Sequence, residues 1–227
     1  MADLTTSTWP ELGPVDVVLI PLGSTEQHGP HLPFDTDAVI ARAVAGGLAD
    51  ALAQRGARAV VAPALTFGSS GEHQDFPGTL SIGQDALTQV IIELARSAKT
   101  WAPRTVFVNG HGGNLAAVNT AVAQLVAEQH AASWVPCALA DADAHAGREE
   151  TSLMLWLAPE AVRLEQAEVG NTSPLAELLP ELRERGVRAV SANGVLGNPL
   201  GASAEEGRLL LDEMVSSALA RLDASSA

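Results

Sequence analysis

The sequence is poor in three kinds of side chain, and each shortage excludes a class of protein. Tyrosine is absent, and the single cysteine, Cys137, allows neither a disulfide within the chain nor a thiolate metal site. Lysine and arginine number 13 against 27 aspartate and glutamate residues. The resulting formal net charge of −14 argues against a nucleic-acid partner and against binding to an anionic membrane surface.

Long apolar runs are missing too. None approaches the ~20 residues that a membrane-spanning helix needs, and residues 1–11 lack the basic start and the apolar core of a secretory signal. We therefore expect a cytoplasmic protein that does not enter a membrane. The 227 residues suffice to bury a core without disulfides, and neither a linker nor a repeat divides them, so we expect a single domain over residues 1–227.

What the sequence does contain is a repeated alternation of short apolar runs and helical patterns. Strands are expected over 15–20, 59–65, 105–108 and 134–140, and helices over 38–52, 85–98, 114–129 and 149–157. After residue 159 the pattern weakens, with helices expected over 172–185 and 204–222. Such alternation predicts an α/β fold of three layers, in which helices cover both faces of a mainly parallel central sheet.

A polar cluster follows each of the four expected strands. The clusters cover residues 23–37, 68–79, 109–114 and 141–150. In a parallel sheet the carboxyl ends of the strands lie at one edge, and α/β enzymes bind their ligands there. We therefore expect the four clusters to meet in one site.

The first cluster, GSTEQHGPHLPFDTD, is rich in side chains that bind metals. Glu26 and His28 are two residues apart and point to the same side in extended backbone, and Asp37 can reach them from a helix start. His111 follows the third strand, and Glu150 lies in the first turn of the helix after the fourth. Carboxylate and imidazole ligands favour Zn²⁺, Mn²⁺ or Fe²⁺, and an aspartate with ligands on both sides would make a two-metal site.

Plainer interpretations exist for the same residues. Asp37 is also suited to be a helix N-cap, and Glu-Gln-His in a loop could simply face solvent. The segment NGHGGN at 109–114 could instead bind a phosphate at a helix N-terminus, although it contains no lysine or arginine. The recurrence of histidine or carboxylate after all four strands favours the metal site.

Four segments resemble motifs of the creatininase (creatinine amidohydrolase) family. They are GSTEQHGPHLP with Asp37, FPGTLS at 76–81, NGHGGN at 109–114 and HAGREETS at 145–152. The resemblance implies a creatininase-like fold, a closed homo-oligomer and two divalent metal ions per chain, namely zinc, iron or manganese. It implies that Glu26 and His111 bind one ion, that His28 binds the other, and that Asp37 bridges them.

The chain departs from creatininase itself at one position. Creatininase has a glutamate two residues after the histidine of the NGHGGN motif, and this chain has Gly113 there. That difference argues against creatinine as the substrate, and we expect Glu150 to supply the missing ligand or base at the second ion. Residues 71–79 and 7–12 most resemble the branch of the family in mycofactocin biosynthesis, which implies a peptidase that removes a C-terminal dipeptide from the modified precursor peptide.

For amide cleavage we expect a metal-bridging water as the nucleophile. His145 follows the fourth strand and is our candidate acid that protonates the leaving amine, with a substrate-orienting histidine as the alternative. Asp141 and Asp143 are expected either to orient His145 or to lie in a solvated loop.

Three further residues are candidates for contacts with the substrate. His73 and Glu72 lie in the long polar segment after the second expected strand, where they are suited to line a binding site. Arg148 lies beside the fourth cluster and could pair with a substrate carboxylate. A plain position on the protein surface is the alternative for all three.

Two other functions are compatible with the same motifs. One is an amidohydrolase that acts on a small cyclic amide or a formamide with the same metals, and the other is a non-catalytic metal-binding scaffold. The scaffold predicts eroded ligands, whereas Glu26, His28, Asp37 and His111 are all present. The sequence therefore predicts a metal-dependent hydrolase of C–N amide bonds, whose partner is a peptide or small amide substrate.

Overall fold

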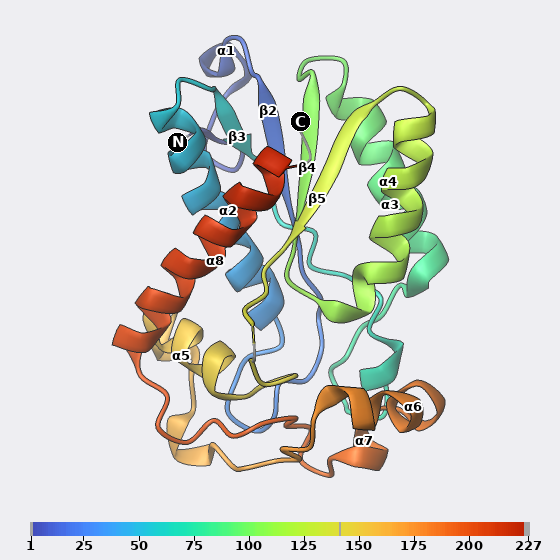
Figure 1. Ribbon diagram of the computed structural model, residues 1–227, viewed down its shortest axis with the longest axis vertical. Coiled ribbons are helices and arrows are strands. Elements are labelled where there is room, and N and C mark those ends of the chain that lie inside the picture. The colour runs from blue at the N-terminus through green and yellow to red at the C-terminus, as the bar shows by residue number, and fades with distance from the viewer. Residues whose placement is uncertain (1, 141, 225–227) are drawn as a thin grey trace.

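A five-stranded parallel sheet forms the centre of the protein, as seen in a computed structural model that describes residues 2–140 and 142–224 (Figure 1). The strand order is β1-β3-β2-β4-β5, and every neighbouring pair is parallel. The strands are β1 (Ala2–Asp3), β2 (Val17–Leu22), β3 (Ala59–Val61), β4 (Arg104–Asn109) and β5 (Ala131–Pro136). The predicted α/β fold with a parallel central sheet is confirmed.

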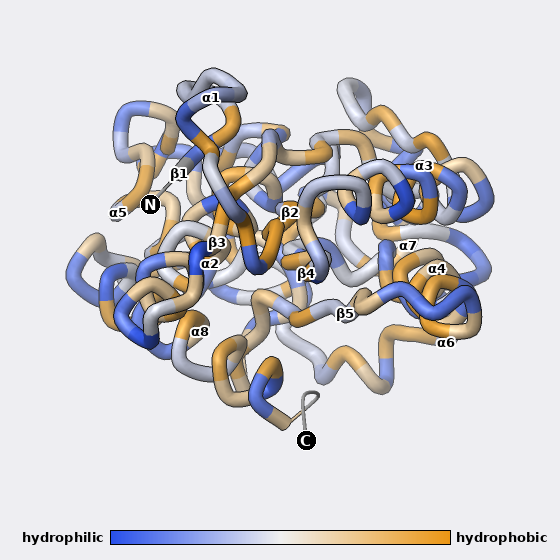
Figure 2. Tube along the Cα trace, turned by 90° about the horizontal axis from the view of Figure 1, so that it is seen from above, coloured by the Kyte–Doolittle hydropathy of each residue, from blue (hydrophilic) through white to orange (hydrophobic). Residues whose placement is uncertain are grey.

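The central strands bury side chains on both faces of the sheet. On β2, Val17 and Leu19 belong to a core shared with α2 (Thr36–Gln54) and α8 (Ala204–Ala224). The alternate residues of β2 belong to a second core, shared with α3 (Gly83–Ala98) and α4 (Leu115–Ala127). The hydrophobic traces of β2 and β3 accordingly lie between the helices in Figure 2. This alternation, which follows from the two-residue period of a strand, produces the predicted three layers.

The remaining elements are shorter and lie mostly at the ends of the sheet. They are α1 (Trp9–Leu12), α5 (Arg148–Leu157), α6 (Leu175–Arg185), α7 (Val187–Val190) and the 3₁₀ helices Gly71–His73, Gly112–Asn114, Pro159–Ala161 and Leu164–Gln166. Within the described ranges, no helix has both the length and the apolar character to cross a membrane.

β2 and β4 lie within two residues of their expected ranges, and the other three strands differ more. The second expected strand contributes only Ala59–Val61, since Pro63 has no N–H for a ladder. β5 begins and ends earlier than expected, because its pairing with β4 runs only from Ala131 to Pro136. β1 is absent from the expected set, and a strand of two residues is too short to leave a periodic pattern.

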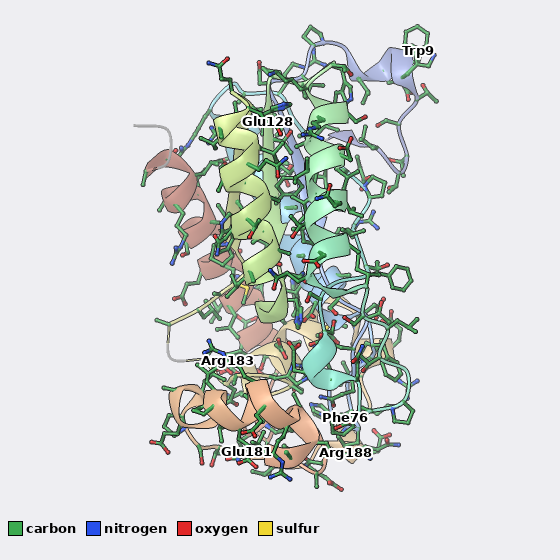
Figure 3. All side chains as sticks on the ribbon, turned by 90° about the vertical axis from the view of Figure 1, so that its right-hand side faces the viewer. Trp9, Phe76, Glu128, Glu181, Arg183 and Arg188 are labelled. Carbon is green, nitrogen blue, oxygen red and sulfur yellow. The ribbon has the colours of Figure 1, made fainter. Side chains whose placement is uncertain are left out.

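The segment 159–203 covers the edge of the sheet where the strands end. Leu196 forms a β-bridge with His145, and the N–H of Arg163 donates to the carbonyl of His31. Leu196 also belongs to a small core with α6 and α7, against which Phe76 packs. In Figure 3, Phe76 and Arg188 lie at this end of the molecule, and Trp9 lies at the opposite end. The carboxyl ends of the strands are therefore enclosed by the C-terminal third of the chain.

Candidate metal centre

The four predicted core ligands lie together at the carboxyl ends of the strands. Glu26 and His28 lie in the segment after β2, Asp37 lies in the first turn of α2, and His111 follows β4. All four are buried, with at most 6% of each residue exposed. The fold thus removes from water a group of side chains that prefer to be charged or hydrogen-bonded.

Two glycines allow the loops to approach the start of α2 closely enough to form the cluster. A Cβ at Gly23 would lie 2.5 Å from the backbone N and Cα of Ala38. A Cβ at Gly110 would lie 2.6 Å from the carbonyl oxygen of Asp37. Both positions exclude any side chain, so the segments after β2 and β4 pass directly against the helix turn that carries Asp37.

Asp37 lies between the two histidines and has one oxygen near each. Its Oδ1 is 3.1 Å from Nε2 of His28, and its Oδ2 is 3.4 Å from Nδ1 of His111. Nε2 of His111 is 3.2 Å from Oε2 of Glu26. Among the described residues, three groups of side chains each have donor atoms within 4.8 Å of one another, and two of these sets contain Asp37. One is Glu26 with Asp37 and His111, and the other is Asp37 with His28 and Glu150. Asp37 is the member that both sets share.

The carboxylates at the centre lack hydrogen-bond donors. Within the part of the chain that the structure describes, both oxygens of Glu26 and Oδ2 of Asp37 are buried without a hydrogen-bond partner. Nearby imidazole nitrogens lie at ion-pair distances, but they do not meet the geometry of a hydrogen bond. Leaving a buried acceptor unsatisfied costs about 1–3 kcal/mol, and more when it is charged. Clustered unsatisfied carboxylates beside imidazoles therefore fit a divalent cation well.

The charges of the cluster shift the acidity of its members strongly. Burial lowers the pKa of His28, but the carboxylates of Asp37, Glu150 and Glu26 outweigh it and raise that pKa to about 10. Burial together with the charge of Glu26 raises the pKa of Asp37. The pKa of His111 is raised because Glu26, Glu72 and Asp37 outweigh its burial. Protons thus occupy the imidazoles of His28 and His111 when no metal is bound, and a metal ion would have to displace them.

His145 lies deeper in the cluster than its predicted role required. Its Nε2 is 2.7 Å from the backbone carbonyl of Gln27, and its Nδ1 is 3.7 Å from Oε1 of Glu26. A carbonyl only accepts hydrogen bonds, so Nε2 carries the proton and Nδ1 presents a lone pair to the site. Burial and the charge of His28 lower the pKa of His145. To act as an acid, His145 would first have to take up a proton at Nδ1. Together with Glu26 and His28 it also forms a set of donors that could hold a metal ion.

His73 and Glu72 reach the cluster from the 3₁₀ helix Gly71–His73. Nε2 of His73 is 3.4 Å from Oε1 of Glu26, and its ring centroid is 4.5 Å from that of His145. Burial and the charge of His145 lower the pKa of His73 to about 2, so this ring is neutral. Oε1 of Glu72 is 3.4 Å from Nε2 of His111, and the Glu72 side chain is 31% exposed. His73 thus lies inside the site, and Glu72 lies at its border with solvent.

Glu72 fills the space beside Gly113. A Cβ at residue 113 would lie 2.3 Å from the carbonyl oxygen of Ser69, 2.4 Å from Nε2 of His111 and 2.5 Å from Oε1 of Glu72. No side chain fits at 113 unless these atoms move. The carboxylate next to His111 therefore comes from Glu72, on a different loop, and not from the NGHGGN motif.

Glu150 lies in the first turn of α5 and is partly buried. Its Oε2 accepts a hydrogen bond from the N–H of Ala146 at 2.6 Å. The Glu150 carboxylate is also one of the three groups in the set with His28 and Asp37. The structure thus brings Glu150 to the side of Asp37 on which His28 lies, where it was expected.

Arg148 is not among the residues that meet at the cluster. Its Nε donates to both carboxylate oxygens of Glu206 on α8, at 2.9 and 3.0 Å. Glu206 also accepts from the hydroxyl of Ser152 at 2.7 Å. Arg148 thus links α5 to α8 in this structure, and its contact with a substrate carboxylate stays a prediction.

The loop before α5 has a structural role in the part that is described. Oδ2 of Asp143 accepts from the backbone N–H groups of Arg148 and Asn198, at 3.0 and 2.9 Å. These contacts hold the loop against segment 159–203 and do not orient His145. Asp141, the other aspartate considered for that role, lies outside the described residues.

Sequence reasoning missed one polar residue at the centre, Gln27. It is 5% exposed, and its amide nitrogen lies 2.9 Å from Nδ1 of His73. The available signal was its position between two candidate ligands in a segment expected to be buried.

Known proteins are similar to this chain in sequence and in fold. The family description Creatinine amidohydrolase (Creatininase) matches residues 5–222. The chain is 53% identical over 209 residues to the mycofactocin precursor peptide peptidase of Mycolicibacterium smegmatis. The matched region covers 92% of this chain and 85% of that protein.

Solved structures agree in fold. A Bacteroides fragilis protein described as a creatinine amidohydrolase has a TM-score of 0.82 at 26% identity, over 95% of this chain and 92% of that one. A structure named "Creatininase Mn" has a TM-score of 0.78 at 25% identity, over 99% and 98% of the two chains.

Proposed function

Because this chain belongs to the creatininase family of amide hydrolases, we propose that it is a metal-dependent peptidase that releases a C-terminal dipeptide from a modified precursor peptide of the mycofactocin type. The observation that carries the proposal is the buried cluster in which Asp37 joins two sets of imidazole and carboxylate donors. The 53% identity with a mycofactocin precursor peptide peptidase supports a peptide, rather than a small cyclic amide, as the substrate.

The donor sets support two divalent ions, which we propose to be zinc, iron or manganese. Glu26 and His111 would hold one ion, His28 and Glu150 would hold the other, and Asp37 would contribute to both. When bound, two such ions lower the pKa of a water molecule and polarise the carbonyl group of the substrate. The unsatisfied oxygens of Glu26 and Asp37 support this assignment, since a cation is the partner they lack.

Proton transfer falls to the histidines of the site. The lone pair on Nδ1 of His145 is suited to take a proton from the attacking water. The same nitrogen then gives this proton to the departing amine as the C–N bond breaks, so that no proton is gained or lost overall. His73 stays neutral because of its burial, and it presents its other ring nitrogen to Glu26.

Glu72 lies beside His111 at the solvent-exposed border of the cluster. This position is suited to contact an entering substrate. Its carboxylate would repel a C-terminal carboxylate held next to it, which favours a substrate that is bound with its terminus pointing away from Glu72.

We further propose a cytoplasmic homo-oligomer. Three large apolar side chains are strongly exposed on the loops beside the site, namely Phe34 at 45%, Phe67 at 43% and Leu80 at 57%. Burial of such side chains against another copy of the chain would remove apolar area from water, which favours association. The lone cysteine and the absence of any possible disulfide within the chain suit a reducing compartment.

The function is tested with purified protein loaded separately with manganese, zinc or iron. Two substrates are incubated separately with each preparation, namely creatinine and peptides that end in Val-Tyr. The products are identified by mass spectrometry. We expect a shortened peptide plus the free dipeptide and no creatine. Turnover of creatinine without peptide cleavage would reverse the assignment of the substrate.

The metal stoichiometry is tested by elemental analysis of protein purified without chelator. Two ions per chain are expected. Fewer than one ion per chain, with peptidase activity unaffected by EDTA, would refute a metal-dependent mechanism.

A further inference from the structure

The amide of Gln27 is held in one orientation by backbone groups. Its Oε1 accepts from the N–H of Gly29 at 2.9 Å, and its Nε2 donates to the carbonyl of Gly194 at 3.0 Å. A backbone N–H can only donate and a carbonyl can only accept. The oxygen and nitrogen of this amide therefore cannot exchange places without the loss of both bonds.

The second amide hydrogen of Gln27 determines where His73 carries its proton. Nε2 of Gln27 is 2.9 Å from Nδ1 of His73 and 3.2 Å from Nε2 of His145. The His145 nitrogen cannot accept, because its own hydrogen is directed to the carbonyl of Gln27 at 2.7 Å. The amide thus donates to Nδ1 of His73, and the hydrogen of the neutral His73 ring lies on Nε2.

The two histidines consequently face Glu26 with opposite chemistry. Nε2–H of His73 lies 3.4 Å from Oε1 of Glu26, and the lone pair on Nδ1 of His145 lies 3.7 Å from the same oxygen. One ring presents a donor to the centre of the site and the other presents an acceptor. Both arrangements depend on Gln27, one through its side chain and the other through its carbonyl.

We propose that Gln27 is a positioning residue that fixes His73 and His145 in opposite tautomers, so that the site holds one imidazole donor and one imidazole acceptor side by side. The tautomers themselves follow from the hydrogen bonds, whatever the substrate. The effect on turnover rests on the proposed peptidase function. The burial of all three residues, each at most 7% exposed, excludes the water that would otherwise compete for these bonds.

The tautomers can be measured directly by long-range ¹H–¹⁵N NMR of the metal-free protein, which has only six histidines. In the unmodified protein we expect His73 with its hydrogen on Nε2 and His145 with its lone pair on Nδ1. A hydrogen on Nδ1 of His73 in this spectrum would overturn the proposal without any variant.

Substitution of the amide provides the second test. Glu at position 27 keeps the shape but replaces the donor with an acceptor, so Gln27→Glu is expected to move the His73 hydrogen to Nδ1. Gln27→Met removes the donor without adding charge and is expected to leave His73 as a mixture of tautomers. Gln74→Glu is the matched control for Gln27→Glu. Gln74 is exposed and follows His73 in the chain, and its substitution makes the same change in charge.

Kinetics complete the test. Since acid–base groups contribute roughly 10²–10⁴-fold to turnover, Gln27→Met is expected to lower kcat at least ~10²-fold with KM within about twofold. The Gln74→Glu control is expected to change neither parameter. Unchanged tautomers in both Gln27 variants, or an unchanged kcat in the folded Gln27→Met protein, would refute the proposal. If the unmodified enzyme cleaves no peptide, the proposed function fails while the NMR test still decides the role of Gln27.

Discussion

Replacement of Gly113 by alanine tests whether the space beside His111 belongs to Glu72. The added Cβ would lie 2.3 Å from the carbonyl of Ser69 and 2.4 Å from Nε2 of His111. Ordinary van der Waals contact begins near 3.4 Å, so at least one of these groups must move by about 1 Å. Gly112 is the matched control, because a Cβ there meets nothing within 4 Å in the same 3₁₀ helix.

The expected size of the effect follows from which atoms can move. The Ser69 carbonyl is part of the backbone, whereas the end of the Glu72 side chain can rotate away at little cost. His111 is the remaining group, and its movement would disturb its contacts with Glu26 and Asp37. Overpacking of this kind costs about 1–3 kcal/mol of stability, and a misplacement of about 1 Å in an active site can cost on the order of 10²-fold in rate.

Three measurements on the two variants decide the matter. The midpoint of urea unfolding reports stability, elemental analysis reports the number of ions bound, and peptide cleavage reports kcat/KM. We expect Gly113→Ala to lose metal and roughly 10²-fold in kcat/KM, while Gly112→Ala matches the unmodified protein in both. Equal metal content and activity in the two variants would show that the crowding around residue 113 has no consequence for the site.

Three further changes have defined outcomes. Asp37→Asn keeps the shape but removes the shared charge, so elemental analysis should find at most one ion per chain, and retention of two ions would contradict the shared role. Burial and the charge of His28 lower the pKa of His31 to about 4, from an ordinary value of 6.5. Between these two pH values His31 is protonated in the unfolded chain and neutral in the native protein. This lowers the free energy of unfolding by up to about 3 kcal/mol as the pH falls from 6.5 to 4. Urea unfolding at pH 7.5 and 4.5 measures this loss of stability, and His31→Gln should make the loss smaller. An equal loss in the variant and the unmodified protein would refute the role of His31. Arg148→Met should cost at most about 1 kcal/mol of stability and leave KM unchanged, whereas a tenfold rise in KM would restore its proposed contact with the substrate.

The parts of the fold that follow a regular period could be predicted from the sequence. β2 is a continuous buried apolar run, and β4 has a buried apolar centre at residues 106–108. Such short runs are typical of the central strands of a parallel sheet. β1 and the end of β5 depend on pairing with neighbouring strands, which no local pattern records. Within segment 159–203, the helix expected over 172–185 is present as α6. The position of this segment over the strand ends could not be derived, because it is set by contacts and not by a period.

Some residues of the candidate site could be predicted from their local sequence, and others depend on contacts with distant parts of the chain. Glu26, His28, Asp37 and His111 could be found because each stands at a strand end or a helix start, where the topology of the fold dictates a shared edge. The role of Gln27 depends on Gly194, which is 167 residues away in sequence. The motif around Arg148 suggested a contact with the substrate. It could not reveal the ion pair with Glu206, because Glu206 lies 58 residues later in the chain.

The enclosure of the strand ends by the C-terminal third also has a consequence for the order in which the protein is made. Every proposed metal ligand lies at or before residue 150, whereas the segment that covers them begins at residue 159 and includes Gly194. A chain leaves the ribosome from its amino end, so the ligands emerge before their cover. The last part of the chain to be synthesised therefore completes the hydrogen bonds that set the histidine protons.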